Sequence, residues 1–130
     1  MKTILLIESN VTILENLVEG LEMEGYNILA SNNGKKGIEL AKHFTPDLII
    51  SAILMTEMDG YEVLRLLLSM DKTCEIPFIF STTKSEKKDK ALAIELGADG
   101  YIIKPYGFEY LFELSKALIT SGSKRQKKYM

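Results

Sequence analysis

The chain has 130 residues, with 46% hydrophobic and 26% charged residues, a balance typical of one globular domain rather than of a disordered chain. Its net charge of −2 argues against a nucleic-acid-binding surface that covers the whole molecule. The only cysteine, Cys74, can form neither an internal disulfide nor a metal cluster, so we interpret it as a partly buried structural thiol. Because no signal peptide and no apolar stretch of ~20 residues is present, we expect a soluble, cytoplasmic protein.

Short apolar runs alternate with amphipathic stretches along the chain. Each apolar run is too short for a helix and is bounded by polar residues, which is typical of a buried strand. The amphipathic stretches have apolar residues at helical spacing. In chain order, the pattern predicts a strand over Thr3–Ile7, a helix from Val11 that stops at Gly25, a strand over Asn27–Ser31, a helix over Gly34–Phe44, a strand over Leu48–Ile53, a helix over Asp59–Met70, a strand over Pro77–Thr82, a helix over Ser85–Leu96, a strand over Gly100–Lys104 and a helix over Phe108–Ile119.

Five strands that alternate with five helices predict an α/β fold, a (βα)₅ doubly wound parallel sheet with helices on both faces. Right-handed crossovers and short loops favour the flavodoxin-like strand order 2-1-3-4-5. We assign residues 1–120 to this single domain. Residues 121–130 carry four positive charges and no apolar period, so we expect a disordered, solubilising tail. A docking arm for an acidic partner or a nucleic acid is the alternative.

Polar residues follow several of the predicted strands at their carboxyl ends. In a parallel sheet these ends share one edge, which is where α/β proteins bind ligands. The first strand leads to Glu8 and Ser9, the fourth ends at Ser81 and Thr82, and the fifth ends at Lys104. The third strand instead leads to Ala52, whose methyl group can neither accept a proton nor attack a substrate. Polar strand ends are common, so this cluster alone is only weakly specific.

Four sequence motifs at these strand ends make the polar cluster more specific. They are "ILLIESN", "DLIISAILMTEMDG", "PFIFSTTK" and "GADGYIIKPY". With these motifs, the segment from Lys2 to Ile119 resembles the receiver domains of bacterial response regulators (CheY-like). The last motif is the most specific, because its glycine, lysine and proline positions all match. The resemblance implies a domain in which an aspartate takes a phosphoryl group from a histidine kinase with the help of Mg²⁺.

The resemblance also assigns a role to each residue at the sheet edge. Glu8 matches the first acidic position of the Mg²⁺ pocket, and Ser9 stands where a second carboxylate is usual. Ala52 occupies the position of the phosphoacceptor aspartate. Thr82 matches the hydroxyl and Lys104 the lysine that contact the phosphoryl oxygens. Tyr101 matches the aromatic residue that changes rotamer in these domains.

These differences predict a degenerate receiver, or pseudo-receiver. Three carboxylates and one lysine give a typical receiver pocket a charge of about −2, which suits a divalent cation. Here Glu8 faces only Lys104, so we expect Mg²⁺ binding to be weak or absent, with no other cofactor. We expect an ion pair between these two residues, with anion binding by Lys104 as the alternative. Ser9 and Thr56, which replaces a usual proline, make natural divergence at Ala52 a better explanation than an engineered change.

We therefore expect a stand-alone signalling module of the two-component family that is not an enzyme and acts through protein–protein contacts. Its partner would be a histidine kinase or another regulator, with homodimerisation as a further option and no membrane or direct DNA binding. The expected surface consists of the fourth helix, the fifth strand and the fifth helix, with exposed cations and aromatics: Lys87, Lys88, Lys90, Tyr106 and Tyr110. Two alternatives are a small-anion pocket formed by Lys104, Thr82 and Ser9, and phosphorylation at a displaced residue. Pro105 is expected to follow a cis peptide bond, as in the family.

Overall fold

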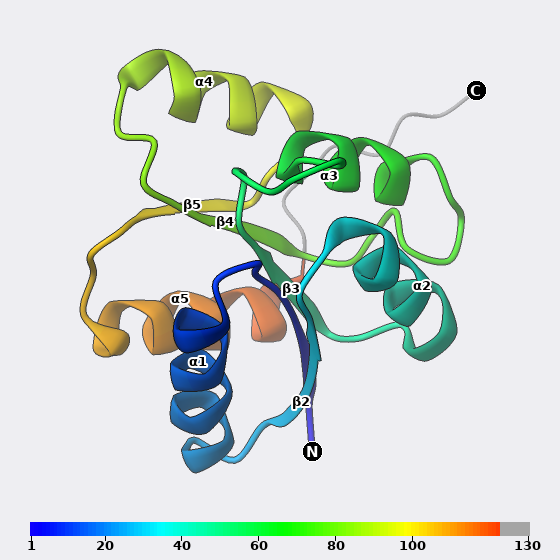
Figure 1. Ribbon diagram of the computed structural model, residues 1–130. Coiled ribbons are helices and arrows are strands. Elements are labelled where there is room, and N and C mark those ends of the chain that lie inside the picture. Colours follow the sequence, from blue (N-terminus) through cyan, green and yellow to red (C-terminus); the bar gives the residue numbers. More distant parts are fainter. Residues whose placement is uncertain (123–130) are drawn as a thin grey trace.

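The computed structural model describes residues 1–122, and these form one five-stranded parallel sheet with helices on both faces (Figure 1). The strands lie in the order β2-β1-β3-β4-β5, which confirms the predicted doubly wound, flavodoxin-like topology. Their bounds are Thr3–Ile7 for β1, Asn27–Ser31 for β2, Leu48–Ser51 for β3, Phe78–Thr82 for β4 and Gly100–Ile103 for β5.

Five helices cover the two faces of the sheet. They are α1 (Val11–Met23), α2 (Gly34–Phe44), α3 (Gly60–Leu68), α4 (Lys87–Leu96) and α5 (Phe108–Ser121). Alternate residues of each strand face opposite ways, so the sheet divides the core into two clusters. One cluster packs the sheet against α2, α3 and α4, and the other packs it against α1 and α5 (Figure 1). Within the described residues, no helix is long and apolar enough to cross a membrane.

Most elements are shorter than the sequence pattern predicts, and the ends have local causes. The expected start of α3 at Asp59 is wrong by one residue, because Asp59 is the N-cap and its side chain accepts a hydrogen bond from the Glu62 N–H (2.9 Å). Ser85 likewise lies outside α4, which begins at Lys87. The strand before α3 ends at Ser51 rather than at Ile53.

The last helix is longer than predicted. It runs to Ser121 instead of Ile119, and Gly122 ends it with a positive φ of 79°. The expected boundary at residue 120 therefore falls within the final turn of α5. The rest of the predicted basic tail, residues 123–130, lies outside the described residues. Cys74 is partly buried, as expected, and its thiol contacts the Asp71 carbonyl.

The strand register aligns the predicted site residues at one edge of the sheet. Ile7 pairs with Ser51, so Glu8 and Ala52 follow neighbouring strands at the same level. The Ala52 N–H continues this pairing by donating to the Ile7 carbonyl (2.9 Å). Thr82 pairs with Ile103, which brings Lys104 to the same edge. The sheet itself thus places the residues that the sequence grouped together.

Gly60 allows the chain to turn back tightly after β3. Its N–H donates to the Ile53 carbonyl at 2.8 Å, so α3 starts directly against the loop that contains Ala52. A Cβ added at Gly60 would lie 2.2 Å from the Ala52 carbonyl oxygen and 2.8 Å from the Ile53 Cα. Both atoms belong to the backbone and cannot move aside as a flexible side chain could. This close approach explains the glycine of the "MDG" motif.

We predict that Gly60→Ala lowers the free energy of unfolding by about 2 kcal/mol or more, because the added methyl group forces the backbone apart. Urea denaturation followed by circular dichroism measures the change. Gly107→Ala is the matched control, since a Cβ there has no atom within 4 Å. Gly107 is the N-cap of α5, where alanine is less favourable than glycine, so its effect should stay within about 1 kcal/mol. Equal effects of the two substitutions would refute this account of Gly60.

Candidate functional site

A buried ion pair between Glu8 and Lys104 occupies the carboxyl edge of the sheet. The Lys104 Nζ lies 2.6 Å from the Glu8 Oε1, and the two side chains are 15% and 6% exposed. The second carboxylate oxygen of Glu8 accepts a hydrogen bond from the Asn10 N–H (3.0 Å). Both oxygens of the carboxylate are therefore engaged by donors of the chain itself. The ion pair expected from the sequence is confirmed.

The backbone holds both partners of this ion pair in place. The Glu8 N–H donates to the Ser31 carbonyl (3.0 Å), and the Lys104 N–H donates to the Thr82 carbonyl (2.7 Å). The peptide bond between Lys104 and Pro105 is cis, as expected. The pair therefore links β1 to β5, two strands that are separated in the sheet by β3 and β4.

Ala52 follows β3 at the carboxyl edge of the sheet and has no polar side-chain atom. The residue is 4% exposed, and its carbonyl accepts a hydrogen bond from the Ser51 hydroxyl (2.9 Å). Its methyl side chain provides no oxygen for phosphoryl transfer or for a metal. Among residues 1–122, no group of three or more His, Cys, Asp or Glu side chains is placed to hold a metal ion.

The other residues assigned to the pocket point in different directions. Ser9 is exposed and lines a shallow hollow of about 480 Å³ together with Thr56 and Asp59. Thr82 is 2% exposed, and its hydroxyl accepts a hydrogen bond from the Lys84 N–H (3.1 Å). Ser9 and Lys104 line separate hollows, and Thr82 lines neither. The structure thus brings Glu8 and Lys104 together but does not gather Ser9, Thr82 and Lys104 in one cavity.

Tyr101 adopts the inward, buried position. It is 8% exposed, and its hydroxyl donates to the Lys84 carbonyl (2.8 Å). Burial, with smaller contributions from nearby Tyr61 and Asp89, raises the pKa of the Tyr101 phenol to about 12. The phenol is therefore a stable hydrogen-bond donor at neutral pH. Thr82 and Tyr101 both hold the backbone of Lys84, a contact that the sequence did not identify.

The predicted interaction residues fall into two groups. Lys87, Lys88, Lys90 and Tyr110 are exposed on α4 and α5, as a contact surface requires. Tyr106 is only partly exposed, and its hydroxyl lies 3.1 Å from the Ser81 hydroxyl. Burial raises the pKa of the Tyr106 phenol. Tyr106 belongs to a hollow beside Lys104 rather than to the exposed group.

Tyr61 was not identified from the sequence as a residue near the site. Its ring packs edge-on against Phe80, and its hydroxyl is buried without a hydrogen-bond partner among the described residues. Burial raises the pKa of its phenol, and Asp89 and Asp59 contribute. At sequence level Tyr61 is one more apolar-face residue of a helix, and only the packing of α3 on the sheet shows that its hydroxyl is buried.

We predict that breaking the Glu8–Lys104 pair costs more than removing it. Lys104→Met leaves an unpaired buried carboxylate, so the free energy of unfolding should fall by about 3 kcal/mol. The double variant Glu8→Gln, Lys104→Met removes both charges while keeping the side-chain volumes, and should lose less than about 1 kcal/mol. Urea denaturation of the two single variants and the double variant measures the coupling.

The exposed pair between Lys42 and Glu39 (3.4 Å) is the matched control for this cycle. Its side chains are 44% and 67% exposed, so Lys42→Met should change stability by less than about 0.5 kcal/mol. A double variant at positions 8 and 104 that is as unstable as Lys104→Met would contradict the prediction.

Comparison with known proteins agrees with this geometry. Residues 4–116 match the family described as "Response regulator receiver domain". The chain is 38% identical over 120 residues to "Probable transcriptional regulator ycf29" of Porphyra purpurea. This match covers 92% of this chain and 57% of that protein. The chain is also 32% identical over 119 residues to "Protein PilH" of Pseudomonas aeruginosa. This match covers 92% of this chain and 98% of that protein. The chain spans about half the length of several curated relatives that it matches.

Solved structures give the same result. The signal receiver domain of a signal transduction histidine kinase from Syntrophus aciditrophicus is 35% identical, has a TM-score of 0.86, and the match covers 100% of this chain and 98% of that one. The Vibrio cholerae chemotaxis protein CheY4 has a TM-score of 0.85 at 23% identity, over 90% of this chain and 98% of that one, and supports the fold alone. With a family match over residues 4–116 and the sheet order 2-1-3-4-5, this chain belongs to the response regulator receiver domain family.

Proposed function

We propose that this chain is a degenerate receiver that signals through protein–protein contacts and is not phosphorylated on an aspartate at the usual position. The observation that carries the proposal is the combination of Ala52 at the acceptor position with the buried Glu8–Lys104 pair. A methyl group cannot form an acyl phosphate. The domain is a binding module rather than an enzyme under this proposal, and the cytoplasm suits its single reduced cysteine.

Weak or absent Mg²⁺ binding is part of the same proposal. Ligand charge and ligand number set the affinity of oxygen sites for divalent cations. Glu8 is the one acidic residue of the pocket, and its charge is offset by Lys104 at 2.6 Å. A metal would have to displace the ammonium and the Asn10 N–H from the carboxylate oxygens. We therefore assign no cofactor to this site.

The contact surface that we propose consists of α4, β5 and α5. Five large apolar side chains are exposed there: Leu92 and Ile94 on α4, Ile103 on β5, and Phe108 and Tyr110 on α5. The helix α4 also carries three exposed cations: Lys87, Lys88 and Lys90. Apolar residues beside positive charges suit recognition of an acidic or mixed protein surface. A histidine kinase, another regulator or a second copy of the chain could supply it.

The two alternative functions have less support. A small-anion site made of Lys104, Thr82 and Ser9 requires these side chains to converge, whereas Thr82 is buried beneath Lys84 and Ser9 lines a different hollow. Phosphorylation at a displaced residue requires an accessible carboxylate or hydroxyl. Asp59 lines the hollow next to Ser9, but its carboxylate caps α3. Both alternatives appear as distinct outcomes of the following experiment.

We predict that the unmodified chain gains no phosphoryl group when incubated with MgCl₂ and acetyl phosphate. Intact mass spectrometry at neutral pH is the measurement, since acyl phosphates hydrolyse in acid. The double variant Ser9→Asp, Ala52→Asp restores the two missing carboxylates and should gain the mass of one phosphoryl group, because the rest of the scaffold is in place.

The variant Ser9→Asn, Ala52→Asn is the matched control, with similar side-chain shape and no carboxylate. Addition of one phosphoryl mass to the unmodified chain would overturn the proposal, and peptide mapping would locate the displaced acceptor. NMR shifts of Lys104 and Thr82 caused by inorganic phosphate, without a change of mass, would favour the small-anion alternative.

A further inference from the structure

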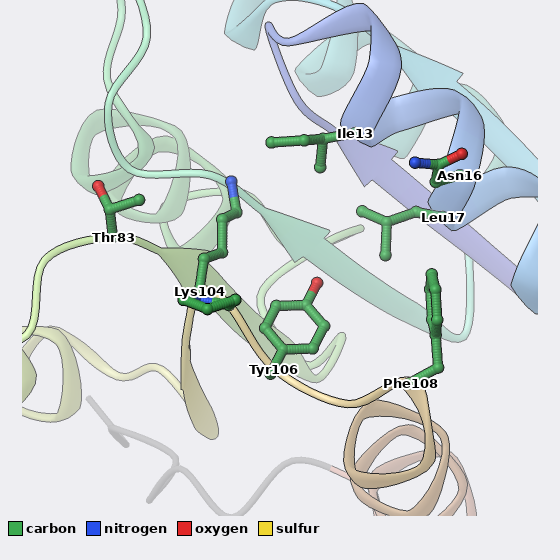
Figure 2. A pocket seen from close by; sticks show the side chains of 8 residues that line it. Ile13, Asn16, Leu17, Thr83, Lys104, Tyr106 and Phe108 are labelled. Atoms are coloured by element: carbon green, nitrogen blue, oxygen red, sulfur yellow. The ribbon is translucent and has the colours of Figure 1, made fainter.

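A second hollow lies beside Lys104, between α1 and the segment that joins β5 to α5 (Figure 2). Its volume is about 490 Å³, within the range of sites that bind small molecules. It is separate from the hollow beside Ser9, since the two have no lining residue in common. Of the residues that line this hollow, only Lys104 corresponds to a residue of the receiver phosphorylation site.

One wall of this hollow is apolar and preformed. Ile13 and Leu17 of α1 face it, and Phe108 closes its end (Figure 2). The Phe108 ring stacks on Phe112 with centroids 5.6 Å apart, and it also packs against Gly20 of α1. Leu17 is 4% exposed, so the wall is anchored in the core, whereas Phe108 is 42% exposed and leaves the hollow open to solvent. Such a wall can bury a compact hydrocarbon or aromatic group without rearrangement.

The opposite wall carries hydrogen-bond donors and a positive charge. Lys104 and Tyr106 lie on this side (Figure 2). Lys104, whose Nζ is bound to Glu8, lines the hollow, and Glu8 does not. An ammonium has three N–H groups, and the bond to Glu8 uses one of them. The Tyr106 hydroxyl is held in place by Ser81 at 3.1 Å. The wall therefore offers a fixed, partly desolvated donor site for an anionic oxygen.

We propose that this hollow binds a small amphipathic carboxylate, with its hydrocarbon or aromatic body on Ile13, Leu17 and Phe108 and its carboxylate at Lys104 and Tyr106. An inorganic anion would leave the apolar wall uncovered. A neutral ligand would leave the remaining ammonium donors without a partner, which costs binding free energy. A cation would meet the Lys104 ammonium. The inference does not depend on whether the chain is phosphorylated.

The test uses the full chain and three probes in an NMR titration of backbone amides. The first probe, 3-phenylpropionate, should shift amides around the hollow, at Leu17, Thr83 and Phe108. The second, 3-phenylpropanol, has the same body without the charge and should bind at least about tenfold more weakly. Inorganic phosphate should leave these amides unshifted. Equal binding of the alcohol, shifts outside the hollow, or no shifts at millimolar 3-phenylpropionate would each overturn the proposal.

Substitutions at Thr83 test the charge requirement without disturbing the core. Thr83 is exposed and lines the hollow. Thr83→Glu adds a like charge and should weaken 3-phenylpropionate binding at least about tenfold at low salt, whereas the matched control Thr83→Gln should bind within about twofold of the unmodified chain. Equal affinities of these two variants would refute the placement of the carboxylate.

A second pair of variants tests the apolar wall. Phe108→Ala removes the ring and should weaken 3-phenylpropionate at least about tenfold. Tyr110→Ala is the matched control, because Tyr110 is 57% exposed on the same helix and does not line the hollow. The dispersion of the amide spectrum verifies that both variants are folded. Unchanged affinity in a folded Phe108→Ala protein would contradict the proposal.

Discussion

The Glu8–Lys104 ion pair is the interaction on which the carboxyl edge of this domain depends. It joins the ends of β1 and β5 across the sheet, at a distance of 2.6 Å and with little access to water. A single charge at this depth would be costly, and pairing offsets part of that cost for both residues. It also gives the edge a net charge near zero.

Several residues of the receiver pattern take part in local packing and hydrogen bonding. Thr82 and Tyr101 hold the backbone of Lys84 by its N–H and its carbonyl, so both contribute to local order after β4. Gly60 allows α3 to approach the Ala52 loop closely. The pattern that is recognisable in the sequence is thus explained in large part by packing and hydrogen bonding. Under the proposed function, a partner protein recognises this scaffold by its surface.

The sequence predicted the topology and the Glu8–Lys104 contact, because both follow from strand alternation and from the shared edge of a parallel sheet. Helix ends were less predictable, since α4 begins at Lys87 without a side-chain cap that the sequence could signal. The direction of Thr82, the buried hydroxyl of Tyr61 and the hollow beside Lys104 could not be predicted. Each depends on contacts between elements far apart in sequence, for which the residue pattern carries no signal.

A crystal structure of the unmodified chain grown with millimolar MgCl₂ and acetyl phosphate tests the central claim most directly. The claim is that the ion pair occupies the place of the metal and the phosphoryl group. The account predicts that the Lys104 Nζ stays within hydrogen-bond distance of the Glu8 carboxylate and that no metal contacts Glu8. A magnesium ion on Glu8, with the Lys104 ammonium displaced from it, would contradict the account.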